Sequence, residues 1–279
     1  MSDVANSSRS EGTRTFSVLD FARRKKAGEP IVMVTAYDAL FASLVEAAGV
    51  DSILVGDSVV SVLAGESTTL SATVDQMIYH GRMVRRGAKR ALVVVDMPFL
   101  SYQVSPVEAV RNGGRILKET GAGAVKLEGG ADMAPAVEAL AKAGVPVMGH
   151  LGFTPQSVHQ LGGHRVQGRG EGALQKLVRD ARALQDAGAF AIVLELMPAL
   201  IAQRVTANLS VPTIGIGAGP RCDGQVLVLH DMLGLNEGFN PGFLKRYAEL
   251  GGEVRGAVSR YAKEVRAGEF PGPEHVRKM

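Results

Sequence analysis

The feature that most constrains the fold is a pattern that recurs along the chain, in which a short apolar run ends in a polar or glycine-rich segment. The runs are separated by stretches with helical periodicity, which indicates strands alternating with helices. Eight such units predict an α/β protein with a closed (β/α)₈ barrel, the TIM-barrel architecture. The predicted strands are Ile31–Thr35, Ile53–Gly56, Ala91–Val95, Ala124–Leu127, Val145–Met148, Ala191–Leu194, Pro212–Ile216 and Val226–Leu229.

The length of 279 residues suits one barrel of roughly 250 residues with short extensions. Residues 1–14 are polar and charged, with nothing to bury, and are predicted to be a disordered tail. Residues 15–279 are predicted to form a single barrel domain. Residues 17–27 are expected to form a short helix against the bottom of the barrel. Capping boxes are predicted at Thr73–Gln76 and, with a proline at the first helical position, at Ser105–Glu108.

Composition excludes several classes of function. No apolar stretch approaches the roughly 18 residues needed to span a bilayer, so no membrane partner is expected. The net charge is only +3, aromatic residues make up 5% and tryptophan is absent, which argues against nucleic-acid binding. The single cysteine, Cys222, and a polar N-terminus without an apolar signal segment favour the cytoplasm.

Two predicted connections are longer than a barrel needs, residues 58–72 and 151–171, and both follow strand ends. Long loops on a compact barrel are usually functional, so both are expected to overhang the active face, and the first is expected to close over it. The connection between the seventh and eighth strands is instead too short for a crossover helix. Its glycines, at 215–219, could cradle a phosphate or simply permit a tight turn.

Three carboxylates follow different predicted strands: Asp57, Asp96 and Glu128. In a parallel barrel the strands end at one face, so these groups are expected to converge there and to repel one another. A hard divalent cation would relieve that repulsion, and ligation by oxygen alone favours Mg²⁺ over Zn²⁺. Each residue taken singly could also be a turn residue or a helix cap.

Lys126 lies two residues before Glu128 on one predicted strand, so both side chains face the same side. The pair could be a structural salt bridge, but buried ion pairs are weak stabilisers. A lysine that binds an anionic substrate beside the metal is the favoured interpretation.

Glu195 and His150 end two further strands. Glu195 is predicted to be a general base, with a buried structural glutamate as the alternative. His150 is predicted to line the site, where it could be a ligand, a hydrogen-bond donor to the substrate or a satisfied core residue. A metal, a lysine and a separate carboxylate base together suit enolate chemistry on a 2-oxo acid, although these residues do not identify the electrophile.

The motifs resemble those of the ketopantoate hydroxymethyltransferase family over about residues 15–270. The resemblance is carried by TAYD at 35–38, VGDS at 55–58, DMPF at 96–99, VKLEGG at 125–130, GHLGFTPQS at 149–157, LELMP at 194–198 and IGIGAGPRCDGQVLVLHDMLG at 214–234.

This resemblance implies a (β/α)₈ enzyme that transfers a one-carbon unit from 5,10-methylenetetrahydrofolate to 3-methyl-2-oxobutanoate through a Mg²⁺-stabilised enolate, giving 2-dehydropantoate for pantothenate biosynthesis. It also implies a homo-oligomer, often a decamer. By motif, Asp57, Asp96 and Glu128 would surround Mg²⁺, and Glu195 would be the proton acceptor. The residues implied to bind the keto acid or line its site are Asp57, Ser58, Asp96, Lys126 and His150.

Two alternatives remain open from the sequence. A lyase of the isocitrate lyase and phosphoenolpyruvate mutase type would share fold and metal use, but those enzymes generally use a loop cysteine, and Cys222 lies in a glycine-rich turn without that context. A non-catalytic barrel that binds a metabolite would not need the carboxylates together.

Overall fold

The computed structural model describes residues 14–163, 165–168, 170 and 172–277. The predicted tail, residues 1–14, therefore lies outside the described residues except for Arg14. By its internal contacts the chain forms two compact units, one ending at Leu227 and the other running from Val228 to Met279.

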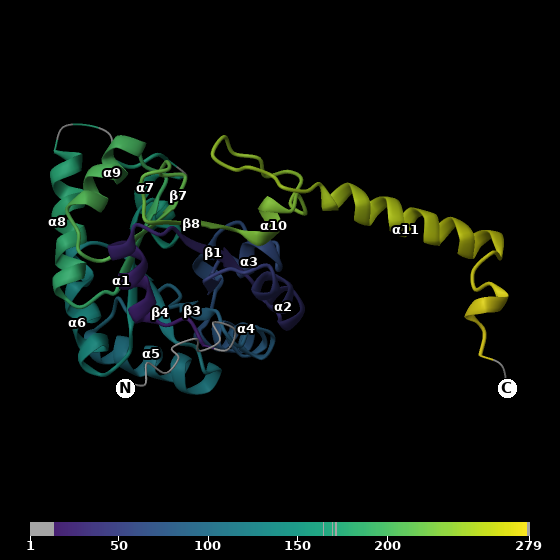
Figure 1. The fold of residues 1–279 in the computed structure, drawn as a ribbon, viewed down its shortest axis with the longest axis horizontal. Helices are drawn as coiled ribbons and strands as arrows, with labels where there is room; N and C mark the ends of the chain where they lie inside the picture. The colour runs from purple at the N-terminus through teal and green to yellow at the C-terminus, as the bar shows by residue number, and fades with distance from the viewer. Residues whose placement is uncertain (1–13, 164, 169, 171, 278–279) are drawn as a thin grey trace, which may run out of the picture. The chain divides into compact units, whose positions relative to one another are not determined.

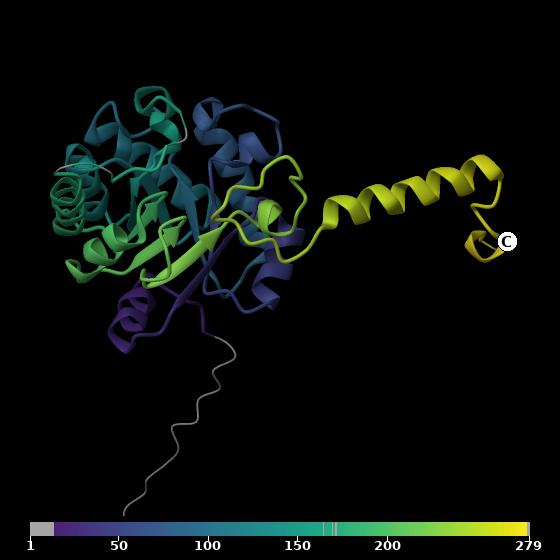
Figure 2. The same cartoon turned by 90° about the horizontal axis from the view of Figure 1, so that it is seen from above.

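The first unit contains a closed barrel of eight parallel strands, in which each strand pairs with the next and β8 pairs with β1 (Figures 1 and 2). The predicted fold class is thus confirmed, with strand ends displaced by a few residues at most. The strands are β1 (Ile31–Thr35), β2 (Ser52–Val55), β3 (Leu92–Asp96), β4 (Ala124–Glu128), β5 (Val147–Gly152), β6 (Ala191–Glu195), β7 (Thr213–Ile216) and β8 (Gly224–Leu227).

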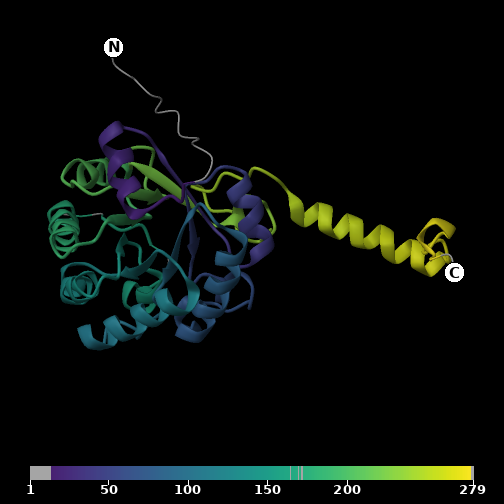
Figure 3. The ribbon, with the colours of Figure 1, turned by 60° about the horizontal axis from the view of Figure 1, so that its bottom comes forward.

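Helices surround these strands, as Figure 3 shows. Residues 217–223, all of them described, join β7 to β8 without a helix, as the short connection predicted. The helices of this unit are α1 (Val18–Ala27), α2 (Ala39–Ala47), α3 (Val59–Val62), α4 (Val74–Gly87), α5 (Pro106–Thr120), α6 (Ala134–Lys142), α7 (Val158–Leu161), α8 (Ala173–Asp186) and α9 (Ala199–Ala207), with short 3₁₀ turns η1 (Thr69–Ser71), η2 (Ala131–Met133) and η3 (Pro155–Ser157).

Local sequence sets where the helices begin. Thr73 and Gln76 form the predicted capping box of α4, each side chain bonding to the backbone N–H of the other. Ser105 caps α5 as expected by accepting from the N–H of Glu108 at 3.2 Å. The second capping box is only half formed, because the Glu108 carboxylate accepts instead from Asn112 and Arg111 one turn further along the helix.

The bottom of the barrel is closed by α1, as predicted. Phe21 is fully buried in the core cluster that contains Ile31 and Leu92, which lie at the starts of β1 and β3. Its ring also makes an edge contact with Phe190, just before β6, at a centroid separation of 5.2 Å. Apolar side chains therefore fill the end of the barrel opposite the strand termini.

The two long loops lie on the face where the strands end. Residues 58–72 contain α3 and η1, and residues 151–171 contain η3 and α7. The turns η1 and η3 contact each other, so the two loops meet above that face. Closure of the first loop remains a prediction.

The second unit contains α10 (Leu229–Met232), α11 (Leu250–Ala267) and η4 (Pro273–His275). Backbone hydrogen bonds from Tyr247 to Met232 and from Leu250 to Leu233 tie the start of α11 to the end of α10. Gly268, with a φ of 70°, ends α11 in the left-handed conformation that glycine adopts without strain.

Replacing Phe21 by alanine is expected to lower the free energy of unfolding by about 3 kcal/mol or more, because the side chain is wholly buried and leaves a cavity. Chemical denaturation followed by circular dichroism measures the change. The control is Leu19→Ala in the same helix, which should cost less than about 1 kcal/mol because Leu19 is 70% exposed. Equal losses in the two variants would contradict the role assigned to Phe21.

Candidate functional site

Four of the predicted site residues continue the inward-facing row of a strand. Successive residues of a strand face opposite sides, so a residue two positions beyond an interior apolar side chain also points inward. The lower positions belong to the buried core cluster, and the upper positions carry the polar groups. The pairs are Val94 and Asp96 on β3, Ala124 and Lys126 on β4, Met148 and His150 on β5, and Val193 and Glu195 on β6.

Asp57 and Asp96 form a directly linked pair. Asp57 follows β2 and donates its backbone N–H to Asp96 Oδ2 at 3.0 Å, and both residues are buried. Burial, and then the negative charges of Asp96 and Glu128, raise the pKa of Asp57 to about 8. Burial also raises the pKa of Asp96, although Lys126 beside it acts in the opposite direction. Burial therefore disfavours two ionised carboxylates at this end of the site unless a cation is added.

Lys126 is a buried cation among these carboxylates. Its Nζ lies 3.0 Å from Asp96 Oδ1 and 3.4 Å from His150 Nδ1. Burial opposes the charge of the ammonium group, but Asp96, Glu128 and Asp57 outweigh it and raise the pKa of Lys126. Lys126 is thus ionised at neutral pH and available to bind an anion.

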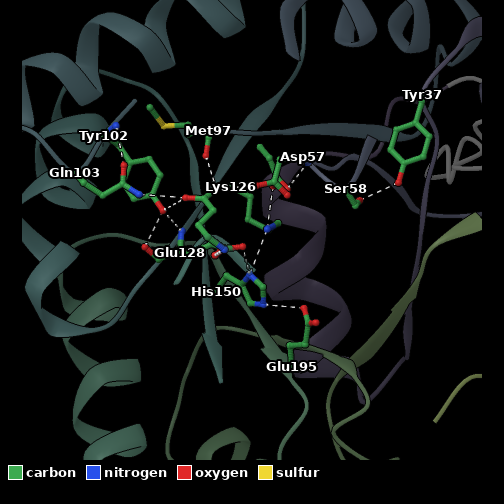
Figure 4. Close-up of polar contacts among 12 residues, drawn as sticks. Tyr37, Asp57, Ser58, Met97, Tyr102, Gln103, Lys126, Glu128, His150 and Glu195 are labelled. Carbon is green, nitrogen blue, oxygen red and sulfur yellow. Dashed lines mark hydrogen bonds and ion pairs between the residues drawn. The ribbon is translucent and has the colours of Figure 1, made fainter. Parts of the chain in front are cut away.

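His150 joins two carboxylates from neighbouring strands. Its Nδ1 lies 3.2 Å from Glu128 Oε1, and its Nε2 lies 3.1 Å from Glu195 Oε2 (Figure 4). Burial and the charge of Lys126 oppose protonation, but the hydrogen bonds to Glu128 and Glu195 raise the pKa of His150 to about 9. The residue is therefore an imidazolium at neutral pH. Burial would raise the pKa of Glu128, but the hydrogen bond and charge of His150 lower it.

Glu195 occupies a less apolar setting than its strand sequence suggests. Its side chain is 17% exposed, against 3% for His150, so it lies at the accessible edge of the cluster. Leu196, with a φ of 46°, turns the chain sharply directly after Glu195, and α9 then begins after Pro198. The end of β5 packs closely against this turn: Phe153 donates its N–H to the carbonyl of Glu195 at 2.9 Å. A Cβ on Gly152 would lie 2.1 Å from that carbonyl oxygen, so only glycine fits there.

Ser58 takes a different partner from the other predicted residues. Its Oγ lies 2.9 Å from the hydroxyl of Tyr37, and Figure 4 shows this pair to one side of the charged cluster. The structure thus brings together Asp57, Asp96, Lys126, Glu128, His150 and Glu195, with Ser58 beside them.

Two residues that the sequence analysis did not single out complete the cluster. Gln156, on η3, donates its backbone N–H to Glu128 Oε2 at 3.0 Å and its side-chain amide to Asp57 Oδ2 at 2.9 Å. The hydroxyl of Tyr102 lies 2.7 Å from Gln156 Oε1. Gln156 falls within the GFTPQS segment, but nothing local to that segment indicates its partners.

The donors fit Mg²⁺. Protein sites for Mg²⁺ commonly supply one or two carboxylates and leave the remaining positions to water and substrate oxygens. Asp57 and Asp96 supply two such groups, and burial is the main cause of their raised pKa values, so a bound cation would favour their ionised forms. Within the described part of the chain, no three Asp, Glu, His or Cys side chains are grouped as a ready-made metal cage. Asp57 and Asp96 would therefore hold the ion, and Glu128 remains a predicted ligand.

Comparison with known proteins places the chain in a family. The sequence model of the family described as ketopantoate hydroxymethyltransferase matches residues 15–273. A protein of Syntrophus aciditrophicus (strain SB) named 3-methyl-2-oxobutanoate hydroxymethyltransferase is 55% identical over 90% of this chain and 92% of its own length. A protein of the same name from Moorella thermoacetica is 57% identical over 91% of this chain and 94% of its own length.

Solved structures support the fold alone. A crystal structure of 2,3-dimethylmalate lyase aligns with a TM-score of 0.59 at 18% identity, covering 93% of this chain and 91% of the other. Phosphonopyruvate hydrolase aligns with a TM-score of 0.61 at 14% identity, covering 92% of this chain and 90% of the other.

Among the described helices, none is long and apolar enough to cross a membrane. With the family model spanning most of its length and relatives above half identity, the chain belongs to the ketopantoate hydroxymethyltransferase family.

Proposed function

We propose that this hydroxymethyltransferase uses 5,10-methylenetetrahydrofolate and Mg²⁺ to convert 3-methyl-2-oxobutanoate to 2-dehydropantoate. The observation that carries the proposal is the position of Glu195. It is a carboxylate at the accessible edge of the cluster, held by a buried imidazolium and separate from the Asp57–Asp96 pair. Proton removal next to a ketone needs a positioned base, and Glu195 is a carboxylate that is not also needed to hold the proposed metal.

The cluster supplies complementary charge for a 2-oxo acid. Lys126 is a cation that can pair with the substrate carboxylate, and Asp57, Ser58, Asp96 and His150 complete the predicted binding surface. Mg²⁺, bound by Asp57 and Asp96, would polarise the ketone and stabilise negative charge on its oxygen.

Glu195 would take the proton from C3 of the keto acid. The electron pair of the C–H bond then moves toward the carbonyl, and C3 becomes the nucleophile that attacks the one-carbon unit of the folate. His150 contacts the carboxylate of Glu195 at 3.1 Å and so orients it for this step. Water must enter later: its oxygen becomes the hydroxyl group of the product, the bond between the one-carbon unit and the folate nitrogen breaks, and that nitrogen takes the proton as tetrahydrofolate leaves. The enzyme is proposed to act in the cytoplasm as a homo-oligomer, a decamer by family resemblance.

The Glu195→Gln variant is expected to bind the keto acid, because glutamine has nearly the same size and shape as glutamate. The rate of proton exchange at C3 should fall by roughly 10²-fold or more, because the proposed base is removed. NMR in D₂O, without folate, measures exchange in both proteins with Mg²⁺ and then with EDTA. Exchange at the wild-type rate in the variant would remove Glu195 as the base. Turnover that does not depend on folate would favour the lyase alternative.

Replacing Asp96 by alanine is expected to weaken Mg²⁺-dependent binding of 3-methyl-2-oxobutanoate by about 10-fold or more, since one of two paired carboxylates is lost. Calorimetry with Mg²⁺ and with EDTA measures the difference. The control is Asp75→Ala, whose side chain is 81% exposed on α4 and which should bind as the wild type does. Unchanged metal-dependent binding in the Asp96 variant would refute the metal assignment.

His150 should make stability depend on pH. Its pKa is raised from 6.5 to about 9, so the folded protein holds the proton more tightly than the unfolded chain. The resulting stabilisation is fully present below pH 6.5 and is lost as the pH rises through about 9. Denaturation in EDTA should therefore show the wild type losing stability relative to His150→Gln across this window. A constant difference between the two proteins would contradict the assigned ionisation.

A further inference from the structure

We propose that Gln156 is a positioning residue that fixes Asp57 and Glu128 relative to each other, with Tyr102 setting the orientation of its amide. Asp57 follows β2 and Glu128 ends β4, strands that are not neighbours in the barrel. The inference rests on the proposed function, because it concerns the carboxylates assigned to Mg²⁺ and the keto acid.

Gln156 contacts the two carboxylates by different groups. Its backbone N–H donates to Glu128 Oε2 at 3.0 Å, and its side-chain Nε2 donates to Asp57 Oδ2 at 2.9 Å. The residue is 5% exposed, so neither bond competes with bulk water. One residue of η3 thus spans the gap between two strand ends.

The amide has no remaining hydrogen-bonding capacity. A glutamine amide carries two N–H donors and an oxygen that accepts two bonds. The second N–H donates to the carbonyl of Met97 at 3.0 Å, and Oε1 accepts from Tyr102 at 2.7 Å and from Gln103 at 3.1 Å. The Met97 carbonyl can only accept a hydrogen bond, which fixes Nε2 toward it and toward Asp57.

Tyr102 holds the amide in this orientation. Its hydroxyl accepts the backbone N–H of Glu128 at 3.0 Å, and its own proton is directed to Gln156 Oε1, the shorter of its two acceptor contacts. The residue is 1% exposed, so loss of the hydroxyl would leave unpaired groups inside the cluster. Tyr102 and Gln156 therefore link the carboxylate of Asp57 to both the backbone and the side chain of Glu128.

This arrangement resembles the outer hydrogen bonds of metal sites, whose loss typically weakens metal binding by roughly 10–100-fold. In Gln156→Asn the side chain is one methylene shorter and cannot reach both Asp57 and Met97, while the backbone bond to Glu128 is kept. Tyr102→Phe keeps the buried ring and removes only the hydroxyl.

The test is the affinity of the protein for Mn²⁺, added as MnCl₂. Mn²⁺ replaces Mg²⁺ because the concentration of free Mn²⁺ can be measured by electron paramagnetic resonance. Gln156→Asn should weaken binding by about 10-fold or more and Tyr102→Phe in the same direction by a smaller factor. Gln160→Asn is the matched control, since Gln160 is exposed on α7 in the same loop. It should bind as the wild type does.

Thermal unfolding in EDTA separates positioning from general stability. A residue that only stabilises the fold would lower the unfolding midpoint without changing the Mn²⁺ affinity of protein that is still folded. Affinity within twofold of wild type in both folded variants would overturn the positioning role and leave the proposed function standing. Absence of Mn²⁺ binding by the wild type would overturn the metal assignment and the positioning role together.

Discussion

The structure depends on the burial of charge at one end of a barrel whose other end is apolar. Lys126 and His150 are each about 96% or more removed from solvent, and each faces carboxylates from neighbouring strands. An isolated buried ion is strongly unfavourable, so these groups are tolerable only as a set. Burial, which raises the pKa values of Asp57 and Asp96, is also what makes this pair the proposed site for a cation. Along the strands, every second side chain faces the interior of the barrel. The apolar core, the buried charge pairs and the proposed chemistry all depend on these inward-facing positions.

Much of this arrangement could be predicted from local sequence. The spacing of Lys126 and Glu128 predicts a shared face, and both side chains do reach the same histidine. Most strand ends could be located because an apolar run stops at a polar residue or a glycine, and the direction of parallel strands then places the polar residues together. The largest difference is in β5, which runs to Gly152 and not to the predicted Met148. The lack of a helix between β7 and β8 followed from chain length alone.

The partners of these residues could not be predicted. The Gln156–Asp57 bond joins positions 99 residues apart, and the Tyr102–Gln156 bond joins positions 54 apart, so both depend on closure of the barrel. The sequence placed Glu195 at the end of an apolar run, yet β5 supplies a cation beside it. A side chain's immediate neighbours come from adjacent strands, and a single sequence does not contain the register between strands.

Gly152, at the end of β5, affects how Glu195, the proposed base, is held. A methyl group at position 152 would press on the carbonyl oxygen of Glu195, and the N–H of Phe153 already binds that same oxygen. The segment at the end of β5 therefore contacts Glu195 at two points: the backbone N–H of Phe153 binds its carbonyl oxygen, and His150 binds its carboxylate. The orientation of the proposed base, Glu195, is thus set by the neighbouring strand, β5. A substitution that widens the gap between β5 and β6 would change this orientation without replacing any ionisable group.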